Sequence, residues 1–184
     1  MKNTNRQIVP SNLISVVDAG KDMPAYLFSK KFQHHLFFDA DITTSGELIC
    51  AIKEVVLTGV GPLLPFAVFS SNTREILGIV EQGEDWPKKM IDITESMHKR
   101  GNYYGFIVVD SSLRWIAYQD DPVSWGVFAF DGKNPWGHVS QDTRDCFANK
   151  KRIEDLLISE SRDDIELVNV FGRDFLFYLN KNYS

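Results

Sequence analysis

Apolar residues recur at helical spacing through the segment TTSGELICAIKEVVLTG, which spans residues 43–59. The positions that form this stripe are Leu48, Ile49, Ile52, Val55 and Val56. Such a stripe predicts a helix with one buried face. Thr44 and Glu47 have the spacing of a capping box, and Gly59 offers a left-handed stop, so we expect the helix to lie between them.

A second helix is predicted after Asp85, where Pro87 follows closely. Proline is tolerated in the first helical turn because its missing N–H would have no intrahelical acceptor there. The apolar stripe of this helix consists of Met90, Ile93, Thr94 and Met97. Lys99 and Arg100 complement the negative C-terminal end of the helix dipole ahead of Gly101.

The remaining apolar segments are short and rich in aromatic and β-branched residues, which is typical of strands. We expect strands at residues 66–71, 75–82, 104–110, 113–119, 123–131 and 165–171, while residues 31–39 form a strand or the end of a helix that runs into one. Most connections between them are short, so neighbouring strands should be antiparallel. A third helix is predicted near residues 152–160, residues 174–179 form a last strand or a short helix, and residues 10–24 form a short helical turn or an irregular entry.

Two of these strands, in the segment LRWIAYQDDPVSWGVFAFDG at residues 113–132, are apolar on both faces. A strand of this kind lies in the middle of a sheet that is covered on both sides. Most rings in this segment should therefore belong to the core. If helices cover only one face, Trp115 and Trp125 should stay partly exposed on the other, near Gly126, which marks a bulge or a close approach by another backbone.

Length and composition fit one globular domain over residues 1–184. The chain is 43% hydrophobic and 24% charged, and its 12% aromatic residues favour a packed sheet. The predicted fold class is α+β, with a mainly antiparallel, twisted sheet of about six to seven strands and about three helices. A polar N-terminus, the absence of a long apolar run and two widely separated cysteines indicate a cytoplasmic protein that does not enter membranes.

The sequence contains none of the motifs GxSxG, GxGxxG, HExxH or the P-loop. Its nearest approach to a metal cluster is His34 and His35 with Asp39 and Asp41. Adjacent strand residues point to opposite faces, so at most one of the two histidines can join both aspartates. We therefore predict no catalytic residue, no cofactor and no metal ligand.

The two cysteines have different surroundings. Cys50 falls near the apolar face of the first predicted helix, where a thiol should be buried and inert. Cys146 lies in the charged segment DTRDCFANKKR and should be exposed.

Negative charge is concentrated in the second part of the chain. The whole chain has a net charge of −5, and residues 110–184 contribute −4 of it, from 9 Lys and Arg against 13 Asp and Glu. The acidic stretch EDLLISESRDDIELVN carries Glu154, Asp155, Glu160, Asp163, Asp164 and Glu166. An acidic protein repels phosphate backbones, which argues against nucleic-acid binding and favours a basic protein partner.

The stretches WIAYQDDPVSWGVFAF and EDLLISESRDD together resemble the bacterial immunity proteins of polymorphic and contact-dependent toxin systems. The resemblance implies a non-enzymatic inhibitor that binds one cognate toxin, commonly a basic nuclease domain. Acidic groups would then speed association, and aromatic anchors would slow dissociation. The predicted partner-binding residues are Trp115, Tyr118, Asp120, Asp121, Trp125, Asp163 and Asp164.

Two other functions stay open at this point. One is a small metal-dependent hydrolase that uses His34 or His35 with Asp39 and Asp41. The other is an accessory or assembly subunit with a self-complementary interface.

Overall fold

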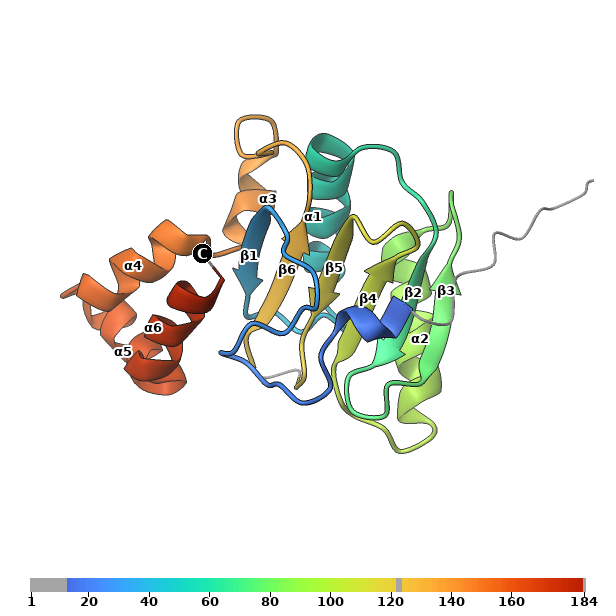
Figure 1. Cartoon of the computed structure of the whole chain (residues 1–184), viewed down its shortest axis with the longest axis horizontal. Coiled ribbons are helices and arrows are strands. Elements are labelled where there is room, and N and C mark those ends of the chain that lie inside the picture. The colour runs from blue at the N-terminus through green and yellow to red at the C-terminus, as the bar shows by residue number, and fades with distance from the viewer. Residues whose placement is uncertain (1–12, 122–123, 184) are drawn as a thin grey trace, which may run out of the picture.

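Six strands form one antiparallel sheet in the order β1-β6-β5-β4-β2-β3 (Figure 1). The strands are β1 (His34–Phe38), β2 (Phe66–Ser70), β3 (Ile76–Val80), β4 (Phe106–Asp110), β5 (Trp115–Tyr118) and β6 (Gly126–Phe130). This computed structural model describes residues 13–121 and 124–183. The predicted α+β class with an antiparallel sheet is confirmed. Residues 10–12 and the predicted strand start at Val123 lie outside the described residues.

Six α-helices surround the sheet in the described part of the chain, twice the expected number. They are α1 (Gly46–Val55), α2 (Trp86–His98), α3 (Gln141–Asp145), α4 (Lys150–Ile158), α5 (Arg162–Phe171) and α6 (Arg173–Asn182). A short 3₁₀ turn, Leu13–Val16, opens the described chain. The additional helices are α3, α5 and α6, which all follow the last strand.

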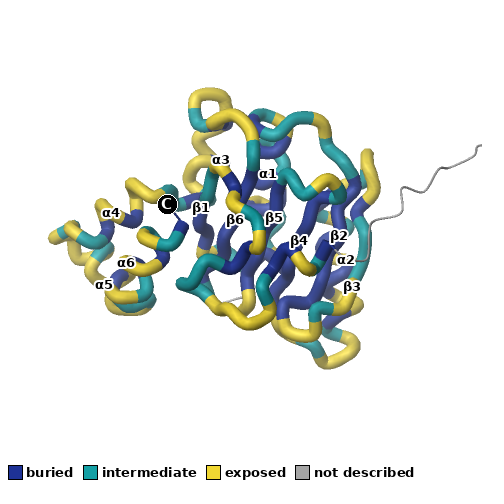
Figure 2. The backbone as a smooth tube through the Cα atoms, in the orientation of Figure 1, coloured by how far each residue is buried: buried dark blue, intermediate teal, exposed yellow. Residues whose placement is uncertain are grey.

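Both faces of the sheet are covered. In Figure 1, α1 and α2 lie behind the sheet, residues 13–32 cross its front, and α4, α5 and α6 form a group beside β1. Apolar side chains from α1 and α2 make one core, and those from residues 13–32 and the C-terminal helices make the other. Every residue of β2, β4, β5 and β6 is buried, as the dark blue of the central strands in Figure 2 shows. The prediction that the central strands are buried on both faces is therefore confirmed.

The strand predicted at residues 165–171 is wrong, because this segment forms α5. Ser161 caps the helix by accepting a hydrogen bond from the Asp164 N–H at 3.2 Å, and Gly172 ends it at a φ of 87°. The outer edge of β1 is already occupied, since Phe37 and Ala148 exchange two backbone hydrogen bonds of 2.8 and 2.7 Å. A later segment therefore cannot add to the sheet beside Phe37, and a helix satisfies its backbone groups within itself. The tail at 174–179 is likewise helical, in α6.

The start of α1 differs by one residue from the expected capping box. Ser45 is the N-cap, and its hydroxyl accepts a hydrogen bond from the Leu48 N–H at 3.1 Å. The hydroxyl of Thr44 instead donates to the carboxylate of Asp41 at 2.7 Å. The Thr44 hydroxyl, which the sequence spacing predicted to cap the helix, is therefore bonded to the Asp41 carboxylate instead.

The other predicted helix boundaries agree more closely with the structure. The carboxylate of Asp85 caps α2 by accepting from the Lys88 N–H at 3.1 Å, as expected. α1 ends at Val55, and the predicted stop at Gly59 lies within the π-helical turn that follows it, Val56–Val60; the positive φ, of 125°, occurs at Gly61. A φ in this region favours glycine, which has no Cβ to clash with the backbone.

Gly126 allows β6 to lie close beneath an aromatic ring of β1. A Cβ atom at this position would stand 2.2 Å from the ring of Phe38. The expected close approach therefore exists, although a side chain and not a backbone makes it.

The substitution Gly126→Ala should lower the free energy of unfolding by about 1–3 kcal/mol, the usual cost of forcing a methyl group into a packed core. Denaturant unfolding followed by tryptophan fluorescence measures this change. Gly137→Ala is the matched control, because a Cβ there meets no atom within 4 Å. Equal stabilities of the two variants would contradict the packing argument.

Candidate partner-binding site

The three aromatic residues that were predicted to bind a partner belong to the core. Trp115, Tyr118 and Trp125 are 1%, 2% and 6% exposed, so the partial exposure of Trp115 and Trp125 that was expected if helices covered only one face does not occur. Trp115 packs on the face of α1 and α2, whereas Trp125 lies on the opposite face, with its ring centroid 5.2 Å from that of Phe171. The physical reason is that helices α4, α5 and α6 and residues 13–32 cover the second face.

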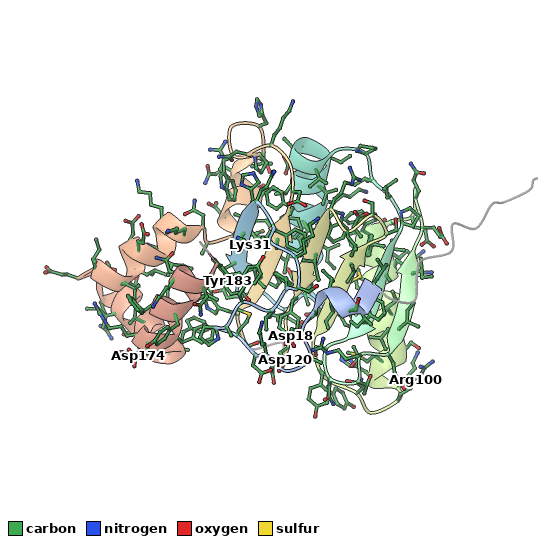
Figure 3. All side chains as sticks on the ribbon, in the orientation of Figure 1. Asp18, Lys31, Arg100, Asp120, Asp174 and Tyr183 are labelled. Carbon is green, nitrogen blue, oxygen red and sulfur yellow. The ribbon has the colours of Figure 1, made fainter. Side chains whose placement is uncertain are left out.

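The four predicted acidic residues lie in two different elements. Asp120 and Asp121 are exposed where β5 leaves the sheet, and Figure 3 shows Asp120 at the lower end of the sheet. Asp163 and Asp164 lie in the first turn of α5, within the C-terminal group of helices. A hydrogen bond from Ser159 and an ion pair with Arg152, at 2.7 Å, hold the pKa of Asp164 below its usual range.

The residues proposed for a metal-dependent hydrolase do not converge. The His34 imidazole is hydrogen-bonded to the Gly132 carbonyl at 3.0 Å, and both carboxylate oxygens of Asp41 accept hydrogen bonds from the threonines that follow it. The ring of His35 packs edge to face with that of Tyr183, with centroids 5.4 Å apart, and burial lowers the pKa of His35 to about 4. Across residues 13–121 and 124–183, no group of three or more His, Cys, Asp or Glu side chains could hold a metal ion.

An open groove of about 690 Å³ lies between α1 and α3. Every charged residue that lines it is acidic: Glu47, Glu54, Asp142 and Asp145. Glu47 and Glu54 are seven positions apart, which places them on one face of α1. This spacing is a signal that the sequence contains. The sequence does not reveal that α3 lies opposite, because α3 follows more than eighty residues later.

Glu54 joins the two walls of the groove. Its carboxylate accepts hydrogen bonds from the N–H and the hydroxyl of Ser140, both at 2.8 Å, and from the hydroxyl of Thr143. These hydrogen bonds lower the pKa of Glu54, because they favour the ionised form. Ser140 is also the N-cap of α3, so the negative charge of Glu54 and the start of this short helix are fixed together.

Both cysteines line the groove. Cys50 is exposed, so the expected burial of this thiol is wrong, while Cys146 is partly buried. Burial, followed by the nearby charges of Glu47 and Asp145, raises the pKa of the Cys146 thiol. A thiol in this environment stays protonated at neutral pH and is a poor nucleophile. The acidic lining of the groove is therefore suited to attracting cationic groups, and Cys146 is not suited to thiolate chemistry.

No protein-family model matches the chain, and comparison with curated proteins and with solved structures finds no significant similarity. Among the described helices, none is long and apolar enough to cross a membrane.

The variant Glu54→Gln should be less stable than the wild type by about 1 kcal/mol at pH 7, since the hydrogen bonds to an ionised acceptor are weakened. The pKa of Glu54 is lowered by folding, so its contribution is complete above the unfolded-state pKa of about 4.3 and is lost as the pH falls through the folded-state value. Denaturant unfolding of both proteins at a series of acidic pH values should show that the difference between their free energies of unfolding decreases as the pH falls. Asp155→Asn, on the exposed face of α4, is the control. A difference that persists in acid would refute the assignment.

Cys146 should react with iodoacetamide more slowly than Cys50 near neutral pH, and its rate should rise only at more alkaline pH, because its pKa is raised. Mass spectrometry of peptides from a labelling time course gives both rates in one sample. Neutralising a neighbouring carboxylate with Glu47→Gln should accelerate Cys146. Faster labelling of Cys146 than of Cys50 at neutral pH would count against the electrostatic account.

Proposed function

We propose that this chain is a non-enzymatic inhibitor, an immunity protein that binds and neutralises one bacterial toxin with a basic nuclease domain. The observation that carries the proposal is the groove between α1 and α3, where all four charged lining residues are acidic. Such a groove fits lysine and arginine side chains of a partner. The same residues on a toxin would contact the phosphates of its nucleic-acid substrate, so the inhibitor would block that face.

The groove is prepared for binding before a partner arrives. Glu54 is already held by Ser140 and Thr143, so its orientation costs little further entropy on association. The acidic residues also attract a basic partner from a distance and raise the association rate, in a manner that salt weakens.

The groove continues toward the C-terminal helices. Asp145 and Cys146 line both the groove and a smaller hollow of about 190 Å³, which also reaches Arg152 in α4 and Leu167 in α5. The helices beyond it expose apolar side chains, of which Val170 is 76% and Phe177 53% exposed. Exposed aromatic and aliphatic groups beside charge are typical of interface anchors. These helices, and not the buried hairpin, would supply the apolar part of the interface.

The test is affinity purification of the tagged full chain from its native cells at physiological salt. We compare the wild type with a groove variant, Glu47→Lys with Asp142→Lys, and with a matched control, Asp92→Lys with Glu95→Lys on the exposed face of α2. We expect one basic protein at near-equal amount with the wild type and the control. Reversing both groove charges should weaken its binding by at least about tenfold.

The captured protein must then be toxic when it is expressed alone in bacteria and harmless when it is expressed with this chain. Equal capture by the groove variant would show that the binding site is wrong. A captured protein without toxicity would show that the immunity function is wrong. The chain would then bind a protein partner that is not a toxin.

A further inference from the structure

Another hollow, of about 420 Å³, lies where the start of β1, the loop after β6 and the start of α4 meet. Its volume falls in the range of small-molecule sites, about 300–1,000 Å³. Tyr183, near the end of the chain, also lines it, and Figure 3 shows this residue beside β1. The hollow shares no lining residue with the groove between α1 and α3, so it is a separate feature of the surface.

The charge of this hollow is opposite to that of the groove. Its described lining contains no aspartate or glutamate, whereas Lys150 and Lys151 of α4 both line it. Asp131, which follows a lining residue in the chain, is ion-paired with Lys30 at 2.5 Å. His35 adds no charge at neutral pH, because burial lowers its pKa to about 4. The hollow is therefore a cationic place on a chain whose net charge is −5.

Three carboxamide side chains line the hollow, and each is held in one orientation. They belong to Gln33, Asn134 and Asn149. The side-chain oxygen of each accepts a hydrogen bond from a backbone N–H, at 3.0, 3.1 and 2.9 Å in that order. A backbone N–H can only donate, so the oxygen must face it, which fixes the position of the NH₂ group. Within residues 13–121 and 124–183, no acceptor is bonded to any of these three NH₂ groups.

The polar side chains around the hollow consequently offer donors and not acceptors. A lysine ammonium group only donates, and the indole N–H of Trp136 has no bonded acceptor in the described part of the chain. A ligand that matches this lining supplies negative charge and several acceptor oxygens, because hydrogen bonds to a charged acceptor are the strong ones. A phosphate group meets both conditions, with three acceptor oxygens and more than one negative charge near neutral pH.

The hollow also has an aromatic wall that a phosphate ion would not use. The ring of Trp136 is partly exposed, and on the protein side it meets Phe147 edge to face, with centroids 6.4 Å apart. The uncovered part of an indole can stack on a flat ring of a ligand. A phosphate ion alone is much smaller than the hollow, so a larger ligand with a ring at its other end fits the lining better.

We infer that this hollow binds a small organic phosphate that carries a flat ring, which is the chemistry of a free nucleotide. The lysines of α4 and the carboxamide NH₂ groups bind the phosphates, and the indole of Trp136 stacks on the ring. The inference goes beyond the proposed inhibitor function and does not rest on it, since no residue of the groove takes part.

The test is a titration of the full chain with adenosine diphosphate, followed by two-dimensional NMR at low ionic strength. The guanosine, cytidine and uridine diphosphates are titrated in parallel. We expect saturable shifts of the Trp136 indole signal and of the side-chain NH₂ signals of Asn134 and Asn149. Pyrophosphate, which lacks the ring, and adenosine, which lacks the phosphates, should each bind at least about tenfold more weakly than adenosine diphosphate.

The variant Asn134→Asp tests the donor groups. A carboxylate can still accept from the Trp136 N–H, so the loop should keep its conformation, while a negatively charged oxygen replaces the NH₂ donor. We expect adenosine diphosphate to bind this variant at least about tenfold more weakly. Asn169→Asp is the matched control, because it adds the same charge at an exposed position of α5 that does not line the hollow. The control should bind like the wild type.

The variant Trp136→Leu separates the ring from the phosphates. It should bind adenosine diphosphate only as tightly as pyrophosphate and leave pyrophosphate binding unchanged, which a general loss of structure would not do. The inference is overturned if none of the four nucleotides shifts these signals up to low millimolar concentration, or if Asn134→Asp binds like the wild type. Binding of adenosine or pyrophosphate as tight as that of adenosine diphosphate would also overturn it. These results leave the groove proposal unaffected, because no groove residue is changed.

Discussion

A sheet with two apolar faces has to be covered twice, and the arrangement of this chain follows from that requirement. The central strands bury every residue, so each face needs its own layer of apolar side chains. Helices α1 and α2 supply one layer. The other is assembled from the two ends of the described chain, where Leu27 and Phe28 pack into the same core as Leu176 and Leu179. The hydroxyl of Tyr183 also donates to the Ala25 carbonyl at 2.9 Å, which ties these ends together.

This double burial decides where recognition can occur. The aromatic residues of β5 and β6 stabilise the interior, so they are unavailable to a partner. The surface includes carboxylates in the groove between α1 and α3 and apolar side chains on the C-terminal helices.

The groove exists only because distant parts of the chain meet. Helix α3 has five residues, too few to be stable alone, and its position depends on the contact of Ser140 and Thr143 with Glu54 in α1. The same contact fixes the charge that we propose to receive a basic side chain. The Glu54 carboxylate therefore both holds α3 in place and belongs to the proposed binding site, so its loss should affect stability and partner binding.

The sequence by itself determined the elements whose signals are local. Helical periodicity placed α1 and α2, and short turns between apolar segments predicted antiparallel strands, because backbone preferences and turn residues act over a few positions. Tertiary structure alone decided which side chains stay exposed. The segment at 165–171 is a helix and not a strand. Trp115 and Trp125 are buried, and Cys50 is exposed in the groove. Burial depends on which distant segment covers a residue, and no local pattern contains that information.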